Sequence, residues 1–546
     1  MTAWNVAEGD GFCLHFGYPD GAAFAAAVHQ LVADKVASRI AAQDPTLWGR
    51  AAEDEAAKRL SWVDLPTASR PLVSEIEALR DELAAQGVSR VVLCGMGGSS
   101  LAPEVICKAA GVPLEVLDSS NPDVVRSALG QDLRATAVVV SSKSGGTVET
   151  DSQKRSFEAA FRDAGIDPTA RIVVVTDPGS PLDKSASADG YRVFRADDKV
   201  GGRYSALTAF GLVPSGLAGA DIGALLDEAH QVQSALSEDS VNNPALRLGA
   251  LLGQASSQGV DKLVLANAGA DFSGFGDWAE QLIAESTGKD GKGILPVVVE
   301  SLEAPNFVPS TPDSVLSTFG PDFPFASVRP ASATGASVDA ALGAQMLIWE
   351  YATAVAGRVI GIDPFNQPDV ESAKAAAREM LDGAGSTPDP SFTDAAISVY
   401  AGDWLPEGTS TAAAAVDALL GNLDAAHGYL AVQAYLDRQR DADLAGCRPE
   451  LATRTGRPVT FGWGPRFLHS TGQYHKGGPA TGVYLQVTAE PAADLEVPGR
   501  EFTYQQFLVA QAIGDGQVLA DKGRPLLRLH LTDLESGLAQ LRALLS

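Results

Sequence analysis

Several short apolar runs, each ending near glycine, serine or aspartate, constrain the fold of this chain more than any other feature. In the first third of the chain they cover residues 89–97, 113–118, 135–142 and 170–177, and valine, isoleucine and leucine dominate them. Segments with helical spacing of apolar residues separate these runs. Uniformly apolar strands that alternate with helices are typical of parallel sheets covered on both faces. A sheet of this kind is therefore predicted here.

Similar runs return further along the chain, at residues 261–269, 293–300, 457–464, 481–488 and 524–532. A chain of 546 residues exceeds the size of one compact core, so several domains are expected. We predict an α/β protein with two doubly wound parallel-sheet lobes and a C-terminal α/β segment. The predicted boundaries are residues 66–225 for the first lobe, 226–390 for the second and 391–546 for the C-terminal segment.

The first 65 residues are predicted to form a helical N-terminal segment. Residues 22–42 and 51–60 are rich in alanine and carry helical apolar spacing, which Asp64, Leu65 and Pro66 interrupt. A second change in composition covers residues 386–412, where Pro, Ser, Thr, Gly and Asp gather. This stretch is predicted to be a boundary or a surface connection.

The charge of the chain narrows the choice of partners. Its formal net charge is −27, and nucleic acids and anionic membrane surfaces carry the same sign, so neither is an expected partner. The N-terminus lacks a leader pattern and no apolar run reaches ~18 residues, so a cytoplasmic protein is expected. The four cysteines show no metal-ligand spacing, so no metal site is expected.

Two strand-to-helix turns in the first lobe have the composition of an anion site. One is GMGGSS at residues 95–100, with Gly98 and Ser99, and the other is SSKSGGT at residues 141–147. Glycines let the backbone approach a ligand, and the free N–H groups of a helix start attract anions. The second turn adds donors and a positive charge and lacks P-loop order, so a nucleotide is not implied; its candidate ligands are Ser142, Lys143, Ser144 and Thr147. Ordinary capping turns are the alternative for either turn alone.

A predicted helix over residues 276–287 carries Gln281 and Glu285 four positions apart, and therefore on one face. A surface position is the ordinary alternative for such a glutamate. Arg203 follows two glycines in a separate loop. Its guanidinium could reach a ligand oxygen, or it could hold the loop through backbone carbonyls.

Two further segments gather polar side chains. FNQPDVESAK at residues 365–374 places Gln367 and Lys374 seven positions apart, two helical turns along one side. LHSTGQYHKGG at residues 468–478 holds two of only seven histidines, His469 and His475, among glycines. A functional loop and a solvated loop are both compatible with this second pattern.

Together these segments resemble the glucose-6-phosphate isomerase family. The resemblance covers residues 85–375 in order, through GMGGSSLAPEV, SSKSGGTVET, GGRYSALTAFGL, EQLIAESTGKDGKGILP and FNQPDVESAK, with the HSTGQY segment added. It implies sugar-isomerase lobes, a cytoplasmic homodimer, and reversible isomerisation of glucose 6-phosphate and fructose 6-phosphate through a cis-enediol without a cofactor. The SSKSGGT turn and Ser99 would bind the sugar phosphate, Glu285 would be the base and Arg203 would stabilise the enediolate. Gln281 and Gln367 would line the pocket, with Lys374 near the ring oxygen.

One feature departs from the family pattern. The ring-opening histidine of the family lies between the Glu285 and Gln367 motifs, and this chain has no histidine there. HSTGQY, which looks like the family's HSxGQY loop, instead follows about 100 residues later, an arrangement that resembles the isomerase half of fused transaldolase–isomerase proteins. His469 is therefore the predicted ring-opening residue, with His475 as its rival. Additional mannose-6-phosphate activity and a non-catalytic sugar-phosphate sensor stay open as alternatives, whereas the missing P-loop disfavours a sugar kinase.

Overall fold

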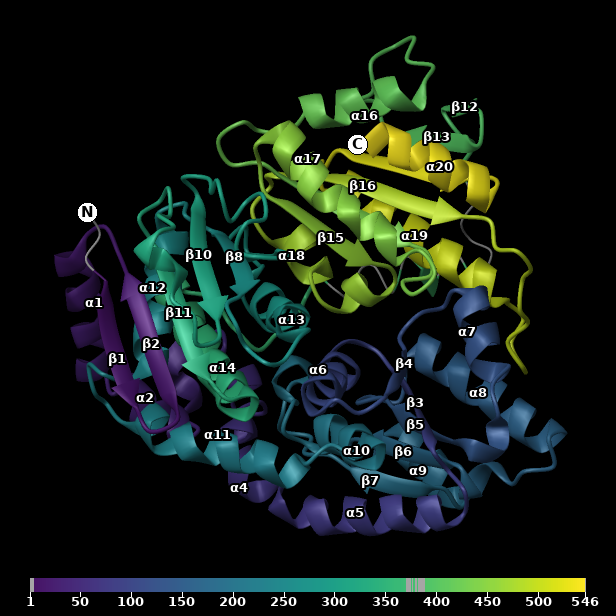
Figure 1. The fold of residues 1–546 in the computed structure, drawn as a ribbon, viewed down its shortest axis with the longest axis horizontal. Helices are drawn as coiled ribbons and strands as arrows, with labels where there is room; N and C mark the ends of the chain where they lie inside the picture. The colour runs from purple at the N-terminus through teal and green to yellow at the C-terminus, as the bar shows by residue number, and fades with distance from the viewer. Residues whose placement is uncertain (1–3, 370–374, 376, 379–380, 382–387, 546) are drawn as a thin grey trace.

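A computed structural model describes residues 4–369, 375, 377–378, 381 and 388–545. The described residues form three β-sheets with helices packed around them (Figure 1). One sheet belongs to the first lobe, one to the second lobe and one to the C-terminal segment. The expected α/β class with largely parallel sheets is confirmed.

The sheet of the first lobe has the order β4-β3-β5-β6-β7, and all its strands are parallel. Alternate side chains of its strands enter two different hydrophobic clusters, with Val91 and Leu93 in one and Val92 and Cys94 in the other. Both faces are therefore buried, which explains why these strands are uniformly apolar. The elements of this lobe are α5 (Arg70–Ala85), β3 (Arg90–Gly95), α6 (Leu101–Ala110), β4 (Glu115–Leu117), α7 (Pro122–Leu129), β5 (Thr136–Ser141), α8 (Val148–Asp163), β6 (Ile172–Thr176), α9 (Pro181–Ala188), β7 (Arg192–Arg195) and α10 (Ala209–Ala218).

The sheet of the second lobe has the order β1-β2-β11-β10-β8-β9. Strands β8 to β11 are parallel, and β2 pairs antiparallel with β11 at the edge. The elements are β1 (Asn5–Gly9), β2 (Phe12–Gly17), α11 (Ile222–Ser237), α12 (Pro244–Ser257), β8 (Lys262–Asn267), α13 (Phe275–Thr287), β9 (Leu295–Val298), β10 (Ser314–Phe319), β11 (Gly335–Ala340) and α14 (Leu342–Ile360).

The N-terminal segment is not purely helical, and this part of the prediction was wrong. Residues 5–17 form the β1–β2 hairpin, because Phe12, Leu14 and Phe16 alternate and bury one face against the second-lobe sheet. The expected helix over residues 22–42 is divided where Lys35 adopts a left-handed conformation, and only one turn forms within 51–60. The helices are α1 (Gly21–Ala33), α2 (Val36–Ala41), α3 (Glu53–Ala56) and α4 (Leu65–Ala68).

The C-terminal segment is a domain with its own sheet, ordered β12-β13-β17-β16-β14-β15, and its own hydrophobic core. Two short strands, β12 and β13, lie within residues 386–412, so this stretch is more than a connection. They pair antiparallel at the edge of four parallel strands. The elements are β12 (Phe392–Asp394), β13 (Ile397–Ala401), α16 (Ala412–Gly421), β14 (Tyr429–Tyr435), α17 (Cys447–Thr455), β15 (Val459–Trp463), α18 (Gly472–Gly477), β16 (Gly482–Ala489), α19 (Tyr504–Asp521), β17 (Leu526–Leu531) and α20 (Leu534–Leu545).

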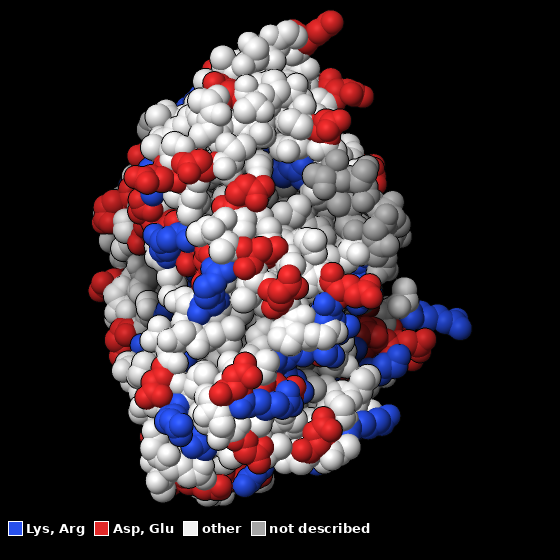
Figure 2. Space-filling view, turned by 90° about the vertical axis from the view of Figure 1, so that its right-hand side faces the viewer, with Lys and Arg blue, Asp and Glu red and all other residues white. Residues whose placement is uncertain are grey.

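The three bodies meet around α13. This helix contacts α6 of the first lobe and α18 of the C-terminal domain, and Figure 1 shows α6, α13 and α18 near the centre of the molecule. On the face drawn in Figure 2, acidic side chains lie among basic ones. In the described part of the chain, no helix has the length and apolar character needed to cross a membrane.

Candidate active site

A cavity of about 580 Å³ opens where the first lobe, the second lobe and the C-terminal domain meet. The turns that follow β3 and β5 line it, as do α13, the 201–203 loop and the 365–368 loop. Ligand sites at the carboxyl ends of parallel strands are usual in open α/β folds. Apart from Lys374, which lies outside the described residues, every site residue predicted from the sequence lines this cavity: Gly98, Ser99, Ser142, Lys143, Ser144, Thr147, Arg203, Gln281, Glu285, Gln367 and His469.

The SSKSGGT turn connects β5 to α8. Thr147 is the N-cap of α8, but its side chain makes no capping bond and instead accepts a hydrogen bond from Ser142 Oγ at 3.1 Å. The Ser144 hydroxyl accepts from the Gly146 N–H at 3.2 Å. Ser142, Ser144 and Thr147 line the cavity beside the start of α8, where hydroxyls and a helix N-terminus favour a phosphate.

Lys143 has a charged partner, and a second cation lies near it. Its Nζ lies 2.6 Å from Asp177 Oδ2, and burial lowers its pKa while Asp177 opposes that shift. The lining also contains Arg59 from the N-terminal segment, which sequence reasoning missed. Arg59 donates to Glu55 Oε1 at 2.8 Å and to the Asp198 carbonyl at 3.2 Å. Two cations, rather than Lys143 alone, therefore border the phosphate turn.

The GMGGSS turn needs its glycines because other chain segments contact it closely. A Cβ at Gly98 would lie 1.9 Å from the Gly202 carbonyl oxygen, which excludes any side chain there. Gly97 has a φ of +59°, and a Cβ on it would lie 3.0 Å from the His469 backbone. The glycines therefore let this turn, the arginine loop and the histidine segment pack together.

Gln281 and Glu285 lie on one face of α13, as their spacing predicts. Gln281 Nε2 donates to Glu285 Oε2 at 3.1 Å and to the His469 carbonyl at 2.8 Å. Glu285 is only 6% exposed, although it lines the cavity. A carboxylate held in this way is shielded from bulk water and is directed at the cavity, which excludes the surface position considered for it.

Arg203 joins Glu285 to the 364–367 loop. Its Nη1 lies 3.5 Å from Glu285 Oε1 and donates to Gln367 Oε1 at 3.0 Å. Its remaining bonds go to Ser286 Oγ and to the carbonyls of Pro364 and Asn366. These contacts use four of the five guanidinium N–H groups, which leaves one Nη1–H for Glu285 or a ligand.

Lys289 also holds the 364–367 loop. Its Nζ donates to the carbonyls of Asp363 and Asn366 and to Asn366 Oδ1, at 2.6–2.9 Å. Burial, with a smaller effect from Arg203, lowers the pKa of Lys289 to about 7. Sequence reasoning gave this residue no role, although it is part of the ESTGK motif.

The two histidines of the HSTGQYH segment lie in different environments. His469 lines the cavity, and its Nε2 lies 3.0 Å from Glu149 Oε1. His475 is buried among Tyr429, Phe467 and Tyr484, outside the cavity lining, and burial lowers its pKa far below the usual value. A neutral buried imidazole cannot serve as an acid at physiological pH, so of these two histidines His469 is the one placed for proton transfer to a ligand in the cavity.

Hydrogen bonds hold the histidine segment against the second lobe. Gln473 Nε2 donates to the Gly288 carbonyl at 2.9 Å, and Gln473 Oε1 accepts from the Asp369 N–H at 3.0 Å. The Gly291 N–H donates to the Gly477 carbonyl at 2.9 Å. The segment is thus a docked helical element, not a solvated loop.

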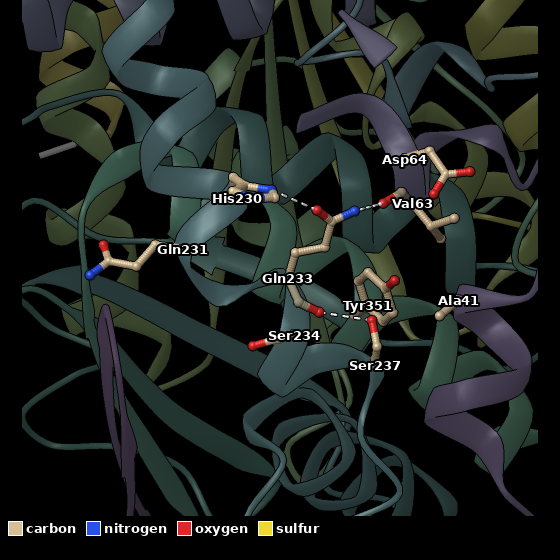
Figure 3. Close-up of a pocket in the computed structure, with 9 residues that line it drawn as sticks. All are labelled: Ala41, Val63, Asp64, His230, Gln231, Gln233, Ser234, Ser237 and Tyr351. Carbon is tan, nitrogen blue, oxygen red and sulfur yellow. Dashed lines mark hydrogen bonds between the residues drawn. The ribbon is translucent and has the colours of Figure 1, made fainter. Parts of the chain in front are cut away.

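A second cavity, of about 470 Å³, lies beside α11 (Figure 3). Gln233 lies within it, bonded to His230 at 3.0 Å and to the Val63 carbonyl at 2.9 Å. Among the described residues that line it, none is a lysine or an arginine. The first cavity therefore suits an anionic ligand much better.

Comparisons with known proteins agree with the geometry of the first cavity. The family model for phosphoglucose isomerase matches residues 74–293. A probable glucose-6-phosphate isomerase of Natronomonas pharaonis is 30% identical over 373 residues, which cover 60% of this chain and 86% of that protein. A protein of the same description from Haloarcula marismortui is 36% identical over 228 residues, but the match spans only 41% of this chain and 52% of that protein.

Solved structures show the same fold. A hypothetical protein of Thermus thermophilus superposes with a TM-score of 0.56 at 25% identity, over 67% of this chain and 99% of that chain. A glucose-6-phosphate isomerase of Chlamydia trachomatis also gives a TM-score of 0.56, at 18% identity, over 70% of this chain and 91% of that chain. About a third of the present chain thus lies outside either superposition.

Proposed function

The chain belongs to the glucose-6-phosphate isomerase family, and we propose that it interconverts glucose 6-phosphate and fructose 6-phosphate in the cavity that holds Glu285. The observation that carries this proposal is the shared cavity of the phosphate turn and a buried carboxylate. The turn binds the phosphate and so fixes the sugar, which leaves C1 and C2 for the carboxylate.

In this proposal Glu285 is the general base. It takes the C2 proton of the open-chain sugar and returns it to C1 through a cis-enediol. Negative charge that develops on O1 and O2 is stabilised by Arg203, whose remaining Nη1–H group lies beside Glu285. Because four of its donors are already engaged within the protein, Arg203 is held in place before the substrate arrives.

Ring opening is assigned to His469, with Glu149 as its partner. The acid must deliver a proton to the ring oxygen, and an imidazole bonded to a carboxylate is held in one orientation for this purpose. Lys374 stays a second candidate near the ring oxygen. Its position lies outside the described residues.

A coupled assay tests the activity directly. Fructose 6-phosphate is the substrate, and an NADP-linked dehydrogenase reports the glucose 6-phosphate formed. Phosphate-ligand binding without turnover would favour the sugar-phosphate sensor, although a sensor has no need of the buried Glu285. Mannose 6-phosphate in the same assay tests the dual-specificity alternative. No contact among the described residues favours that alternative.

Three further expectations rest on the sequence and on the family resemblance. A homodimer, a cytoplasmic location and a relation to fused transaldolase–isomerase proteins stay predictions. Light scattering and cell fractionation test the first two.

A further inference from the structure

Gln511, on α19 of the C-terminal domain, bridges the first lobe and the ring-opening pair. Its Nε2 donates to Glu149 Oε1 at 2.7 Å, and its Oε1 accepts from Ser120 Oγ at 2.5 Å. Gln511 is 5% exposed, and Ser120 is fully buried. The amide therefore joins two segments of the first lobe from a helix of another domain.

The orientation of this amide is fixed by its neighbours. An ionised carboxylate can only accept hydrogen bonds, so the NH₂ group of Gln511 must face Glu149. The Gln511 carbonyl then faces the Ser120 hydroxyl, which donates to it. The same Glu149 oxygen also faces His469 Nε2 at 3.0 Å. Glu149 thus receives one donor from Gln511 and one from His469.

We propose that Gln511 is a positioning residue for ring opening, because its amide holds the Glu149 carboxylate turned toward His469. The inference rests on the proposed isomerase function. Gln511 lies outside the cavity lining and acts only through Glu149. It would make ring opening depend on the docking of the C-terminal domain, which supplies both Gln511 and His469.

His469 and Gln511 are the side-chain donors to Glu149, and a bond from the Glu149 backbone N–H adds to their effect. Burial alone would raise the pKa of the Glu149 carboxyl, whereas the bonds from His469 and Gln511 lower it. Charged groups on the surrounding elements have partners of their own: Arg90 with Glu115, Arg126 with Asp123, Arg155 with Asp151, Lys154 with Glu158, Arg466 with Glu104 and Asp118, and Lys476 with Asp515. Loss of the amide would therefore leave a buried carboxylate that favours proton uptake, and a protonated Glu149 supports His469 less well.

The variant Gln511→Leu removes the donor and replaces the amide with an apolar side chain of similar size. We expect the turnover of cyclic glucose 6-phosphate to fall about 10- to 100-fold, as for the loss of a hydrogen bond to a charged group. Proton exchange into 5-deoxyfructose 6-phosphate, which cannot close a furanose ring, should stay within about twofold of the wild type, because that step uses Glu285 and Arg203 and needs no ring-opening acid. Gln505→Leu is the matched control, since Gln505 lies on the same helix and its side-chain amide donates to the Ala489 carbonyl, away from Glu149.

The variant Gln511→Glu keeps the shape of the side chain and adds a pH signature. Two carboxyls that share a hydrogen bond hold one proton between them to a higher pH than an isolated carboxyl does. While this proton is held, the introduced carboxyl can donate to Glu149 as the amide does. The turnover of this variant should therefore decline as the pH rises through neutrality, relative to the wild type, and recover at lower pH. A merely structural role would give no such pH dependence.

The outcomes distinguish failure of this inference from failure of the proposed isomerase function. An inactive wild type would reject the isomerase function itself. An active wild type with a normal Gln511→Leu, or with equal losses for ring opening and proton exchange, would overturn the role of Gln511. If Gln511→Leu fails to fold, Ser120→Ala and Gln511→Glu decide the question. For the inference to stand, Ser120→Ala must impair ring opening selectively, and Gln511→Glu must do so above neutral pH and recover at lower pH.

Discussion

The guanidinium of Arg203 and the carboxylate of Glu285 lie 3.5 Å apart, and both side chains are at least nine-tenths buried. Arg203 also holds the 364–367 loop through two backbone carbonyls and Gln367. Two functions meet in one side chain, because the cation that faces the base also shapes the cavity wall. Substitution of Glu285 is therefore a cleaner test of the chemistry than substitution of Arg203.

We expect Glu285→Gln to lower the turnover number by ~10³-fold or more, because the amide cannot accept the C2 proton. The shape of the side chain is kept, so the thermal unfolding midpoint and the binding of a phosphorylated inhibitor should change little. Steady-state kinetics and isothermal titration measure the two quantities. Near-normal turnover would reject Glu285 as the base.

The phosphate turn should affect binding more than chemistry. The double variant Ser144→Ala, Thr147→Ala removes two hydroxyls from the turn that leads into α8. We expect a higher Michaelis constant with a nearly constant turnover number, because phosphate contacts are shared by the ground state and the transition state. Ser185→Ala on α9, with an exposed hydroxyl bonded to the Leu182 carbonyl, is the matched control. An unchanged Michaelis constant would contradict the phosphate site.

Local sequence patterns predicted the strand-to-helix turns because adjacent residues determine each of these turns. Glycines and hydroxyls after an apolar run specify both the backbone path and the anion site. β10 was missed for the opposite reason. Its fully buried Ser314, Ser317 and Thr318 interrupt the apolar run that would indicate a buried strand.

Local sequence patterns could not predict contacts between residues far apart in the chain. Glu149 stands within the quoted SSKSGGTVET motif, but its partners His469 and Gln511 lie 320 and 362 positions further along the chain. Arg59 likewise reaches the cavity from a segment whose role the sequence left open. Nothing in the spacing of residues along one element reports a contact made between domains.

The choice between the two histidines yields a selective prediction. His469→Ala should strongly reduce the turnover of cyclic glucose 6-phosphate and spare proton exchange in an open-chain analogue, because only ring opening is lost. His475→Ala removes a ring buried among aromatic side chains, so it should lower the thermal midpoint instead. A selective ring-opening defect in His475→Ala, with normal His469→Ala, would transfer the role to His475. If neither variant shows the defect, ring opening must depend on Lys374 or on water.

Arg466 ties the segment that carries His469 to the first lobe. Its Nη1 lies 2.6 Å from both Glu104 Oε2 and Asp118 Oδ2, with the arginine 8% exposed. Arg438 adds a second contact to Glu104 at 2.9 Å. Burial would raise the pKa of Glu104, but the ion pairs with Arg466, Arg438 and Lys108 outweigh it and lower that pKa well below the usual value.

We expect Arg466→Met to destabilise the protein by about 3 kcal/mol at neutral pH, because it leaves buried carboxylates without their main partner. In the wild type, Glu104 contributes stability above the ordinary carboxyl pKa, and this contribution is lost as the pH falls toward its lowered pKa. In the variant the buried carboxyl gains from proton uptake, so the deficit should shrink as the pH falls from about 7.5 to about 5. Thermal midpoints of both proteins at the two pH values measure this change, and turnover should fall with the displacement of His469. A deficit that is independent of pH would show that Arg466 acts through packing and not through its charge.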